Sequence, residues 1–343
     1  MADAGHDVHL LVADGLGPQR INEVQVHDVG KPRNTLYRLL ITNLALLRKC
    51  LKLKADVCHF HDPELIIVGF LLTFFGKRVV YDVHEDFPVQ VMAKEYMPVL
   101  LRKFISKGFV FLEWLTIWRF SCIITSTDFI ENKFKKRGYD AIAIKNYPKL
   151  DDIEFRPVDW SSKENALCYI GSLRKVRGVD TLVDCLGQID EVSLYLAGSF
   201  DEQGLREELE QKEAWGRVDY LGFIDRKGIN EVLHKSKVGM VTLMPLPNYL
   251  DSLPIKMFEY MAAGIPVVTS DFPFWKQIID ESQCGLYVDP SSTEAISNAI
   301  QTLLDDSDKA YQMGQNGLEA VKKVYNWEIQ EKKLIQSYQK LMQ

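Results

Sequence analysis

The chain has 343 residues, of which 47% are hydrophobic and 26% are charged, and its formal net charge is −6. This composition is typical of an ordered globular protein, and the length predicts two domains. The acidic balance argues against a general nucleic-acid surface. The six cysteines are scattered without a C-x-x-C pair or a metal-ligand spacing, which predicts buried, reduced thiols.

Short apolar strands alternate with helices through the first half of the chain. The predicted strands are "DVHLLVAD", "DVCHFH", "KRVVYDVH" and "CIITST". The apolar run at residues 65–76 is too short to cross a bilayer, and we predict a buried helix there. No strand and glycine-rich loop precede the first predicted strand, so we expect this domain to lack its first βα unit.

Histidines lie at the ends of two of these strands. In "CHFHDPE" we expect His59 and His61 to lie on opposite faces, which predicts no metal pair, and we expect His61 with Asp62 to cap the next helix. His84 ends the strand in "VVYDVHEDFP", a position where catalytic residues are common. It is suited to donate a hydrogen bond to a sugar hydroxyl, or alternatively it is held by an acid that follows it.

Residues 95–120 are unusually aromatic and carry Arg102, Lys103 and Lys107. One interpretation is a contact with a membrane or with a lipid-linked acceptor. The alternative is a pair of core helices in the first domain. Both interpretations remain open.

A polar segment at residues 149–164 interrupts the pattern, which resumes with "ALCYIGS", "SLYLAGS", "VDYLGFI", "VGMVTLM" and "IPVVTS". We predict domains at 1–148 and 165–325, a linker at 149–164, and a final helix at 326–343 that packs back on the first domain. Apolar strands separated by helices predict parallel sheets covered on both faces. Two such doubly wound domains are expected to bind ligand at the carboxyl ends of their strands.

A cationic loop follows the first strand of the second domain. In "YIGSLRKVRGVDTL", Gly171 ends the strand, and Arg174, Lys175 and Arg177 follow before the next helix. Basic side chains over a glycine loop suit a diphosphate. Exposed loops also carry such residues without any ligand.

The segment "NYLDSLPIKMFEYMAAGIPVVTSDFP" places two acids eight positions apart. Pro254 predicts a helix start and Gly264 predicts its end. Glu259, inside this helix, is suited to accept hydrogen bonds from a ribose, and Asp251, before it, to contact a sugar. The alternative is an exposed turn at Asp251 and an ion pair between Glu259 and Lys256.

From about Ala4 to its C-terminus, the chain resembles retaining nucleotide-sugar glycosyltransferases of the GT-B fold. It is most similar to the family-4 group, which has many members in bacterial surface-polysaccharide assembly. The resemblance rests on an acid, seven residues, and a glutamate that leads into "EYMAAGIPVV". It implies that Glu259 holds the donor ribose, that Asp251 contacts the donor sugar, and that His84 lies near the sugar and the acceptor.

The chain departs from the family pattern at several of these positions. Asp251 stands where glutamate is usual, and Ser252 stands where glycine is usual. In the phosphate loop Ser172 replaces an arginine, Arg177 matches a lysine, and Arg174 is the candidate replacement. The predicted donor-binding residues are Gly171, Arg174, Arg177, Asp251, Ser252, Leu253 and Glu259.

The resemblance implies transfer of a hexose-type sugar from a nucleoside diphosphate to a glycan or a lipid-linked acceptor. It implies no metal and no cofactor apart from the nucleotide sugar as co-substrate. The expected location is cytoplasmic, with the inner face of the plasma membrane as the alternative. A catalytically inactive or truncated GT-B binding module, and a sugar epimerase or phosphorylase of the same fold, remain as alternatives.

Overall fold

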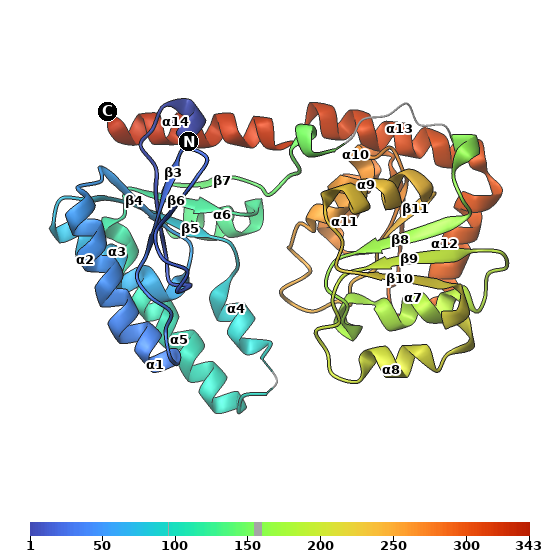
Figure 1. The fold of residues 1–343 in the computed structure, drawn as a ribbon, viewed down its shortest axis with the longest axis horizontal. Coiled ribbons are helices and arrows are strands. Elements are labelled where there is room, and N and C mark those ends of the chain that lie inside the picture. The colour runs from blue at the N-terminus through green and yellow to red at the C-terminus, as the bar shows by residue number, and fades with distance from the viewer. Residues whose placement is uncertain (95, 154–159) are drawn as a thin grey trace. The chain divides into compact units, whose positions relative to one another are not determined.

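The computed structural model describes residues 1–94, 96–153 and 160–343, which form two compact units. Unit 1 comprises Met1–Lys145 together with Glu331–Gln343, and unit 2 comprises Asn146–Gln330 (Figure 1). Residues 154–159 of the predicted linker lie outside the described residues. Each unit contains a sheet of parallel strands with helices between them, and unit 1 also has an antiparallel pair, β2 (Gln19–Ile21) with β3 (Val24–Asp28).

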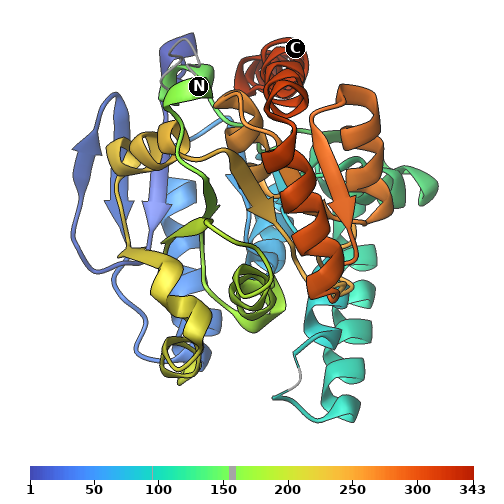
Figure 2. The same cartoon turned by 90° about the vertical axis from the view of Figure 1, so that its right-hand side faces the viewer.

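Unit 1 contains a four-stranded parallel sheet in the order β4-β5-β6-β7. Its strands are β4 (Val57–Phe60), β5 (Arg78–Val83), β6 (Cys122–Thr125) and β7 (Ala141–Ala143). A second, three-stranded sheet has the order β1-β3-β2 and is drawn in blue in Figure 2. Its strands are β1 (His9–Val12), β2 (Gln19–Ile21) and β3 (Val24–Asp28). The strand predicted in "DVHLLVAD" is therefore present, and it pairs in parallel with β3.

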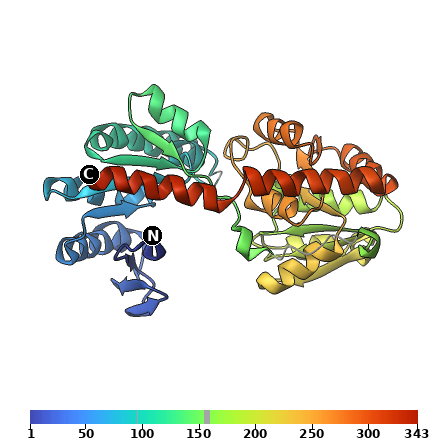
Figure 3. The same ribbon diagram turned by 90° about the horizontal axis from the view of Figure 1, so that it is seen from above.

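The helices of unit 1 come from distant parts of the chain. They are α1 (Thr35–Tyr37), α2 (Asn43–Leu53), α3 (Ile66–Phe74), α4 (Phe87–Met92), α5 (Val99–Thr116), α6 (Asp128–Lys136) and the end of α14 (Trp327–Met342). Strand residues Val79 and Tyr81 share a core with Ile66 of α3 and Phe134 of α6. Figure 3 shows α14 lying along this unit, where Tyr338 Oη is 2.5 Å from His59 Nδ1.

Unit 2 contains a six-stranded sheet in the order β10-β9-β8-β11-β12-β13, and all of its neighbouring strands are parallel. The strands are β8 (Ala166–Ile170), β9 (Ser193–Ala197), β10 (Val218–Gly222), β11 (Val238–Val241), β12 (Val267–Ser270) and β13 (Gly285–Val288). The strands predicted in the second half of the sequence are confirmed. Strand order reverses between β8 and β11, and in such sheets ligands bind at the carboxyl ends of the strands at this point.

Two hydrophobic cores cover the two faces of this sheet. Because successive strand residues point to opposite faces, Cys168 of β8 packs in one core and its neighbour Tyr169 in the other. The helices of unit 2 are α7 (Val179–Leu186), α8 (Leu205–Glu210), α9 (Arg226–Lys235), α10 (Ile255–Ala262), α11 (Pro273–Ser282), α12 (Thr293–Asp305) and α13 (Ser307–Lys323). Helices α9, α10 and α11 pack in the first core, and α7, α8 and α12 in the second. Figure 1 shows α9 and α10 on the opposite side of the sheet from α7 and α8. The cores fix the ends of β8 and β11, where the predicted site residues lie.

Candidate functional sites

Lys256 is a buried lysine near the carboxyl ends of β8 and β11, the switch point at which the strand order of unit 2 reverses. It was not among the predicted site residues. It belongs to the first turn of α10 and is only 8% exposed, and its Nζ lies 3.3 Å from the centroid of the Tyr169 ring. The ammonium has no hydrogen-bond acceptor among the described residues. Burial, together with the nearby Arg177, holds the pKa of Lys256 well below its usual value. A buried cation without an acceptor points to an anionic ligand.

Arg177 reaches the same place from the cationic loop. A Cβ atom built on Gly171 would lie 3.9 Å from Lys256 Nζ and 4.0 Å from Arg177 Nη1, so both cations lie beside the space that glycine leaves open. The Nε atom of Arg177 is also buried without an acceptor among the described residues. The backbone of Gly171 has φ +136°, a conformation that side-chain-bearing residues rarely adopt. Gly171 and Arg177 therefore lie together, as their sequence positions predicted.

The backbone of the loop also lies very close to the residue that follows β11. A Cβ on Gly178 would lie 1.9 Å from the carbonyl oxygen of Thr242, which follows β11, and Gly178 has φ +73°. Only glycine fits here, so the cationic loop packs directly on the end of β11. The position of Arg177, which directly precedes Gly178, is therefore restricted by this backbone contact.

The two remaining candidates of this loop differ from Arg177. Arg174 is exposed, in the residue that precedes the short helix Lys175–Arg177. Ser172, which stands where the family pattern has arginine, donates a 2.5 Å hydrogen bond to Asp201 Oδ2. Lys256 rather than Arg174 is thus the second cation beside Gly171. The only sequence signal for it is a single lysine in the apolar first turn of a helix.

The two acids of the α10 segment lie where the sequence predicted, one before the helix and one inside it. Glu259 has a side chain that is 13% exposed, and its Oε1 accepts a hydrogen bond from Arg226 Nη1 at 2.8 Å. The alternative pairing of Glu259 with Lys256 is therefore wrong, because the lysine side chain lies over Tyr169 instead. Partial burial raises the pKa of Asp251.

Ser252 and Leu253 have structural roles in the turn before α10. Ser252 Oγ donates to the carbonyl oxygen of Tyr249 at 2.9 Å, and the Ser252 carbonyl accepts from Trp275 Nε1 at 2.7 Å. Leu253 packs against the core that contains α10. The turn is therefore fixed on both sides, which gives Asp251 a defined position.

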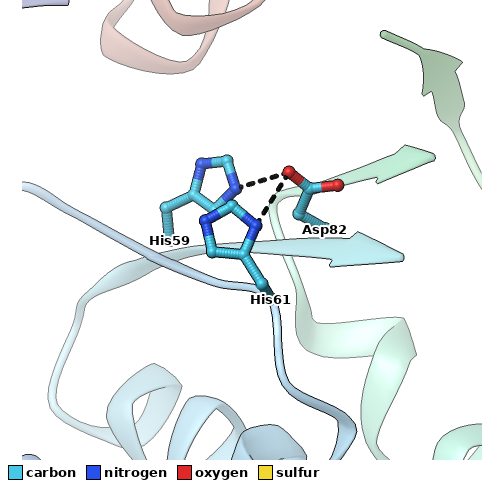
Figure 4. A group of neighbouring side chains, drawn as sticks. All are labelled: His59, His61 and Asp82. Carbon is cyan, nitrogen blue, oxygen red and sulfur yellow. Dashed lines mark hydrogen bonds and ion pairs between the residues drawn. The ribbon is translucent and has the colours of Figure 1, made fainter. Parts of the chain in front are cut away.

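A second cluster of polar residues lies in unit 1, at the carboxyl ends of β4 and β5 (Figure 4). Asp82 Oδ2 is 3.1 Å from His59 Nε2, 3.1 Å from His61 Nδ1 and 3.5 Å from His84 Nε2. The ring nitrogens of His61 and His84 are 2.9 Å apart. Two pairs of residues that are distant from each other in sequence thus meet because β4 and β5 are parallel neighbours with His59 opposite Val80.

The electrostatics of this cluster follow from the buried carboxylate at its centre. Burial acts to raise the pKa of Asp82, but hydrogen bonds from His59, His61 and His84 outweigh it and hold that pKa far below its usual range. The hydrogen bond with Asp82 in turn raises the pKa of His84, against the effect of burial. His84 is therefore held by Asp82 and His61, and not by an acid that follows it.

Two expectations about the first histidine pair are wrong. His59 and His61 do not lie on opposite faces, because residues two apart on an extended chain project from the same face, and their ring centroids are 4.7 Å apart. Asp62 precedes the short helix Pro63–Leu65 without a side-chain capping bond. His61 instead points into the cluster around Asp82.

Helix α5 carries an exposed apolar stripe. Leu100, Phe104, Phe111 and Trp114 of this helix, spaced by four, seven and three residues, are 57–82% exposed, and Trp118 in the short helix that follows is 61% exposed. Phe109 of the same helix is buried in the core of unit 1. The helix therefore has one core face, and its other face leaves large side chains in solvent. No helix within the described ranges has the length and apolar character needed to cross a membrane.

Two family models match the chain, one to each unit. The model for glycosyltransferase family 4 matches residues 1–145, and the model for glycosyl transferases group 1 matches residues 151–320. The second match contains both the cationic loop and α10. The chain belongs to the GT-B glycosyltransferases.

Curated relatives of this glycosyltransferase act on different sugars. The phosphatidyl-myo-inositol mannosyltransferase of Mycobacterium leprae is 25% identical over 210 residues, which are 59% of this chain and 54% of the relative. The N-acetyl-alpha-D-glucosaminyl L-malate synthase of Bacillus anthracis is 24% identical over 94% of this chain and 86% of its own length. The match thus spans about half of the mannosyltransferase and most of the malate synthase.

Solved structures confirm the GT-B fold of the glycosyltransferase. The sucrose-phosphate synthase of Thermosynechococcus elongatus superposes with a TM-score of 0.82 at 20% identity, over 99% of this chain and 90% of that protein. HepE of Anabaena, solved in complex with UDP, superposes with a TM-score of 0.73 at 18% identity, over 92% and 86% of the two chains. The fold expectation of two doubly wound parallel-sheet domains is therefore confirmed.

Proposed function

We propose that this protein is a retaining glycosyltransferase that moves a hexose-type sugar from a nucleoside diphosphate to a hydroxyl of a glycan or a lipid-linked acceptor in polysaccharide assembly. The bond between the anomeric carbon and the diphosphate oxygen breaks, and the acceptor oxygen forms a new bond to that carbon. The acceptor's proton passes to the departing diphosphate. The nucleotide sugar is the co-substrate, and the proposed transfer is independent of any metal.

One observation carries the donor half of this proposal. Lys256 and Arg177 both lie beside Gly171, and each has a buried nitrogen without an acceptor among the described residues. Two neighbouring basic side chains at the carboxyl ends of β8 and β11, each with a nitrogen that lacks an acceptor among the described residues, match the charge of a diphosphate. In a site shielded from water, they would stabilise the negative charge that develops on the leaving group.

The other residues take roles around this diphosphate. Glu259 would hold the ribose, with Arg226 orienting its carboxylate through the 2.8 Å contact. Asp251, Ser252 and Leu253 would form the turn that contacts the donor sugar. His84 of unit 1 would align the donor sugar or the acceptor.

The apolar stripe of α5 supports a lipid-linked acceptor. Its exposed aromatic side chains are accompanied by the exposed cations Lys103 and Lys107. An apolar stripe flanked by lysines is suited to the interface of an anionic membrane. We accordingly propose a cytoplasmic protein that works at the inner face of the plasma membrane.

The donor proposal is tested by following the melting temperature of the purified chain with UDP-sugars and GDP-sugars. A donor at 100 times its Kd adds about 2.7 kcal/mol of stability. Glu259→Ala should abolish the shift, whereas His84→Ala should keep the shift and lose transfer. A folded sample that responds to none of the donors would contradict the donor site.

The two alternative functions give different results in the same samples. A binding module would show the melting shift with no release of nucleoside diphosphate, even when candidate acceptors are added. An epimerase would convert the donor into an isomeric nucleotide sugar without any acceptor. A phosphorylase would release sugar phosphate from a glycan in the presence of inorganic phosphate.

A further inference from the structure

We propose that His59, His61 and Asp82 form a zinc-binding site in unit 1, a site that the transferase chemistry of unit 2 does not require. The three side chains supply two imidazole nitrogens and one carboxylate oxygen, and these donor atoms all lie within 4.8 Å of one another (Figure 4). Two histidines and one carboxylate are a common ligand set for a catalytic zinc with an open position.

The distances around Asp82 suit metal ligands as well as hydrogen bonds. In a tetrahedral zinc site with bonds of 2.0–2.1 Å, neighbouring ligand atoms are about 3.3 Å apart. Asp82 Oδ2 is 3.1 Å from both His59 Nε2 and His61 Nδ1. With His84 Nε2 also at 3.5 Å, three ring nitrogens surround one oxygen, which has lone pairs for about two hydrogen bonds.

The groups around the cluster would orient a ligating histidine and attract a cation. His59 directs its other ring nitrogen to Tyr338 Oη at 2.5 Å, and such a partner orients a ligating histidine and fixes its tautomer. Asp82 is 9% exposed, so its charge is poorly screened by water. The neighbouring Asp62 and Glu85 add further negative charge, which attracts a cation.

There is also room for a ligand beside His61, one of the three zinc ligands proposed here. A cavity of about 370 Å³ is lined by His61 and by His84, Asp62 and Glu85. A water molecule or an oxygen ligand in this cavity would complete the coordination. His84 lies beside this position and would hydrogen-bond such a ligand.

The chain provides its own control in a second histidine pair of unit 1. His9 Nδ1 lies 2.9 Å from His27 Nε2, and His9 Nε2 lies 3.2 Å from Asp7 Oδ2. Here the two contacts use opposite nitrogens of one ring, so the three groups do not converge on one point. A metal site requires that convergence, and His9→Ala should therefore leave zinc binding unchanged.

The experiment measures zinc binding by the full chain after its purification tag has been removed and its metals have been stripped. Zinc is titrated in competition with a chromophoric chelator, and Co²⁺ is titrated while its visible absorption is followed. We expect one zinc per chain, at least tenfold weaker binding in His61→Ala and His59→Ala, and no change in His9→Ala. Tyr338→Phe should weaken binding about tenfold through loss of the outer hydrogen bond.

Several outcomes would overturn the zinc site. These are no zinc uptake by the wild-type chain, equal uptake by wild type and His61→Ala, or displacement of zinc by Mg²⁺, which prefers oxygen ligands. His61 is largely exposed, so its replacement is expected to preserve folding, and circular dichroism checks this. Zinc binding is measured without any nucleotide sugar, so this test and the donor test fail independently.

Discussion

At the level of single residues, Lys256 is expected to lower the stability of the free protein while it favours the binding of an anionic ligand. A buried ammonium that lacks an acceptor destabilises the free protein, although its position over Tyr169 offsets part of this cost. We expect Lys256→Met to raise the free energy of unfolding by roughly 1–4 kcal/mol, as measured by urea denaturation without nucleotide. Lys276→Met removes a partly exposed lysine that also lies over a ring, that of Tyr287, and pairs with Asp271, and it should change stability by under about 0.5 kcal/mol. A destabilised Lys256→Met variant would mean that the lysine has a structural partner.

The two arginines of the cationic loop are expected to contribute unequally. Arg177 lies beside Gly171 with a buried nitrogen, whereas Arg174 is exposed. Arg177→Gln should weaken UDP binding about 10–100-fold, the effect of losing a hydrogen bond between charged groups. Arg174→Gln should weaken it by less than about threefold, because exposed charges are screened. Fluorescence titration with UDP measures the affinity of each variant. A larger loss in Arg174→Gln than in Arg177→Gln would place the diphosphate beside Arg174.

The amine of Lys256 should also take up a proton when the donor binds. Burial and Arg177 lower the pKa of this lysine in the free protein, while the nearby Glu259 and Cys168 act to raise it. An anionic diphosphate would raise that pKa further. Affinity should therefore fall as the pH rises from the lowered pKa of the free protein toward the pKa in the complex. Calorimetry of a UDP-sugar in two buffers of different ionisation enthalpy measures the uptake, which should vanish in Lys256→Met.

At the level of elements, the packing of the cationic loop on β11 depends on one glycine. Gly178 and Gly204 each directly precede a helix, and both glycines have a positive φ, +73° and +79° respectively. A Cβ on Gly178 meets the Thr242 carbonyl at 1.9 Å, whereas nothing lies within 4 Å of one on Gly204. Gly204→Ala should cost about 1 kcal/mol for its backbone conformation alone. Gly178→Ala should cost about 1–3 kcal/mol more, because the new atom forces the loop away from the strand. Equal losses in chemical denaturation would show that the loop does not need this close approach.

Helix α5 provides a separate test of the membrane proposal. Replacing Phe104 and Phe111 by serine removes two exposed rings from its stripe. We expect cosedimentation with vesicles of anionic phospholipid to fall at least tenfold, because membrane affinity scales with the apolar area that is buried. Phe223→Ser is the matched control, since Phe223 is 90% exposed in unit 2. Wild-type protein that stays in solution with these vesicles would contradict the membrane contact.

At the level of the whole molecule, the fold was predictable and the chemistry was predictable only in part. Alternation of apolar strands and helices was enough to predict strands such as "ALCYIGS" and "IPVVTS", because strands buried on both faces are continuously apolar. Pro254 and Gly264 predicted the ends of α10, since their effects on the backbone are local.

The sites depend on contacts that local patterns do not encode. Lys256 meets Arg177 only because α10 and the cationic loop follow strands that are neighbours in the sheet. Asp82 meets His59 and His61 through the parallel pairing of β4 with β5. The sequence contains each residue, but the register that brings them together is a long-range property of the sheet.

The central claim is that unit 2 binds a nucleoside diphosphate through the two cations beside Gly171. Titration calorimetry of UDP into the wild-type chain and into the double variant Arg177→Gln, Lys256→Met tests it most directly. We predict binding to the wild-type chain with one site, and a loss of at least 100-fold in the double variant, with Lys276→Met unchanged. Binding of equal strength to the wild-type and double-variant chains would place the diphosphate elsewhere and contradict the account.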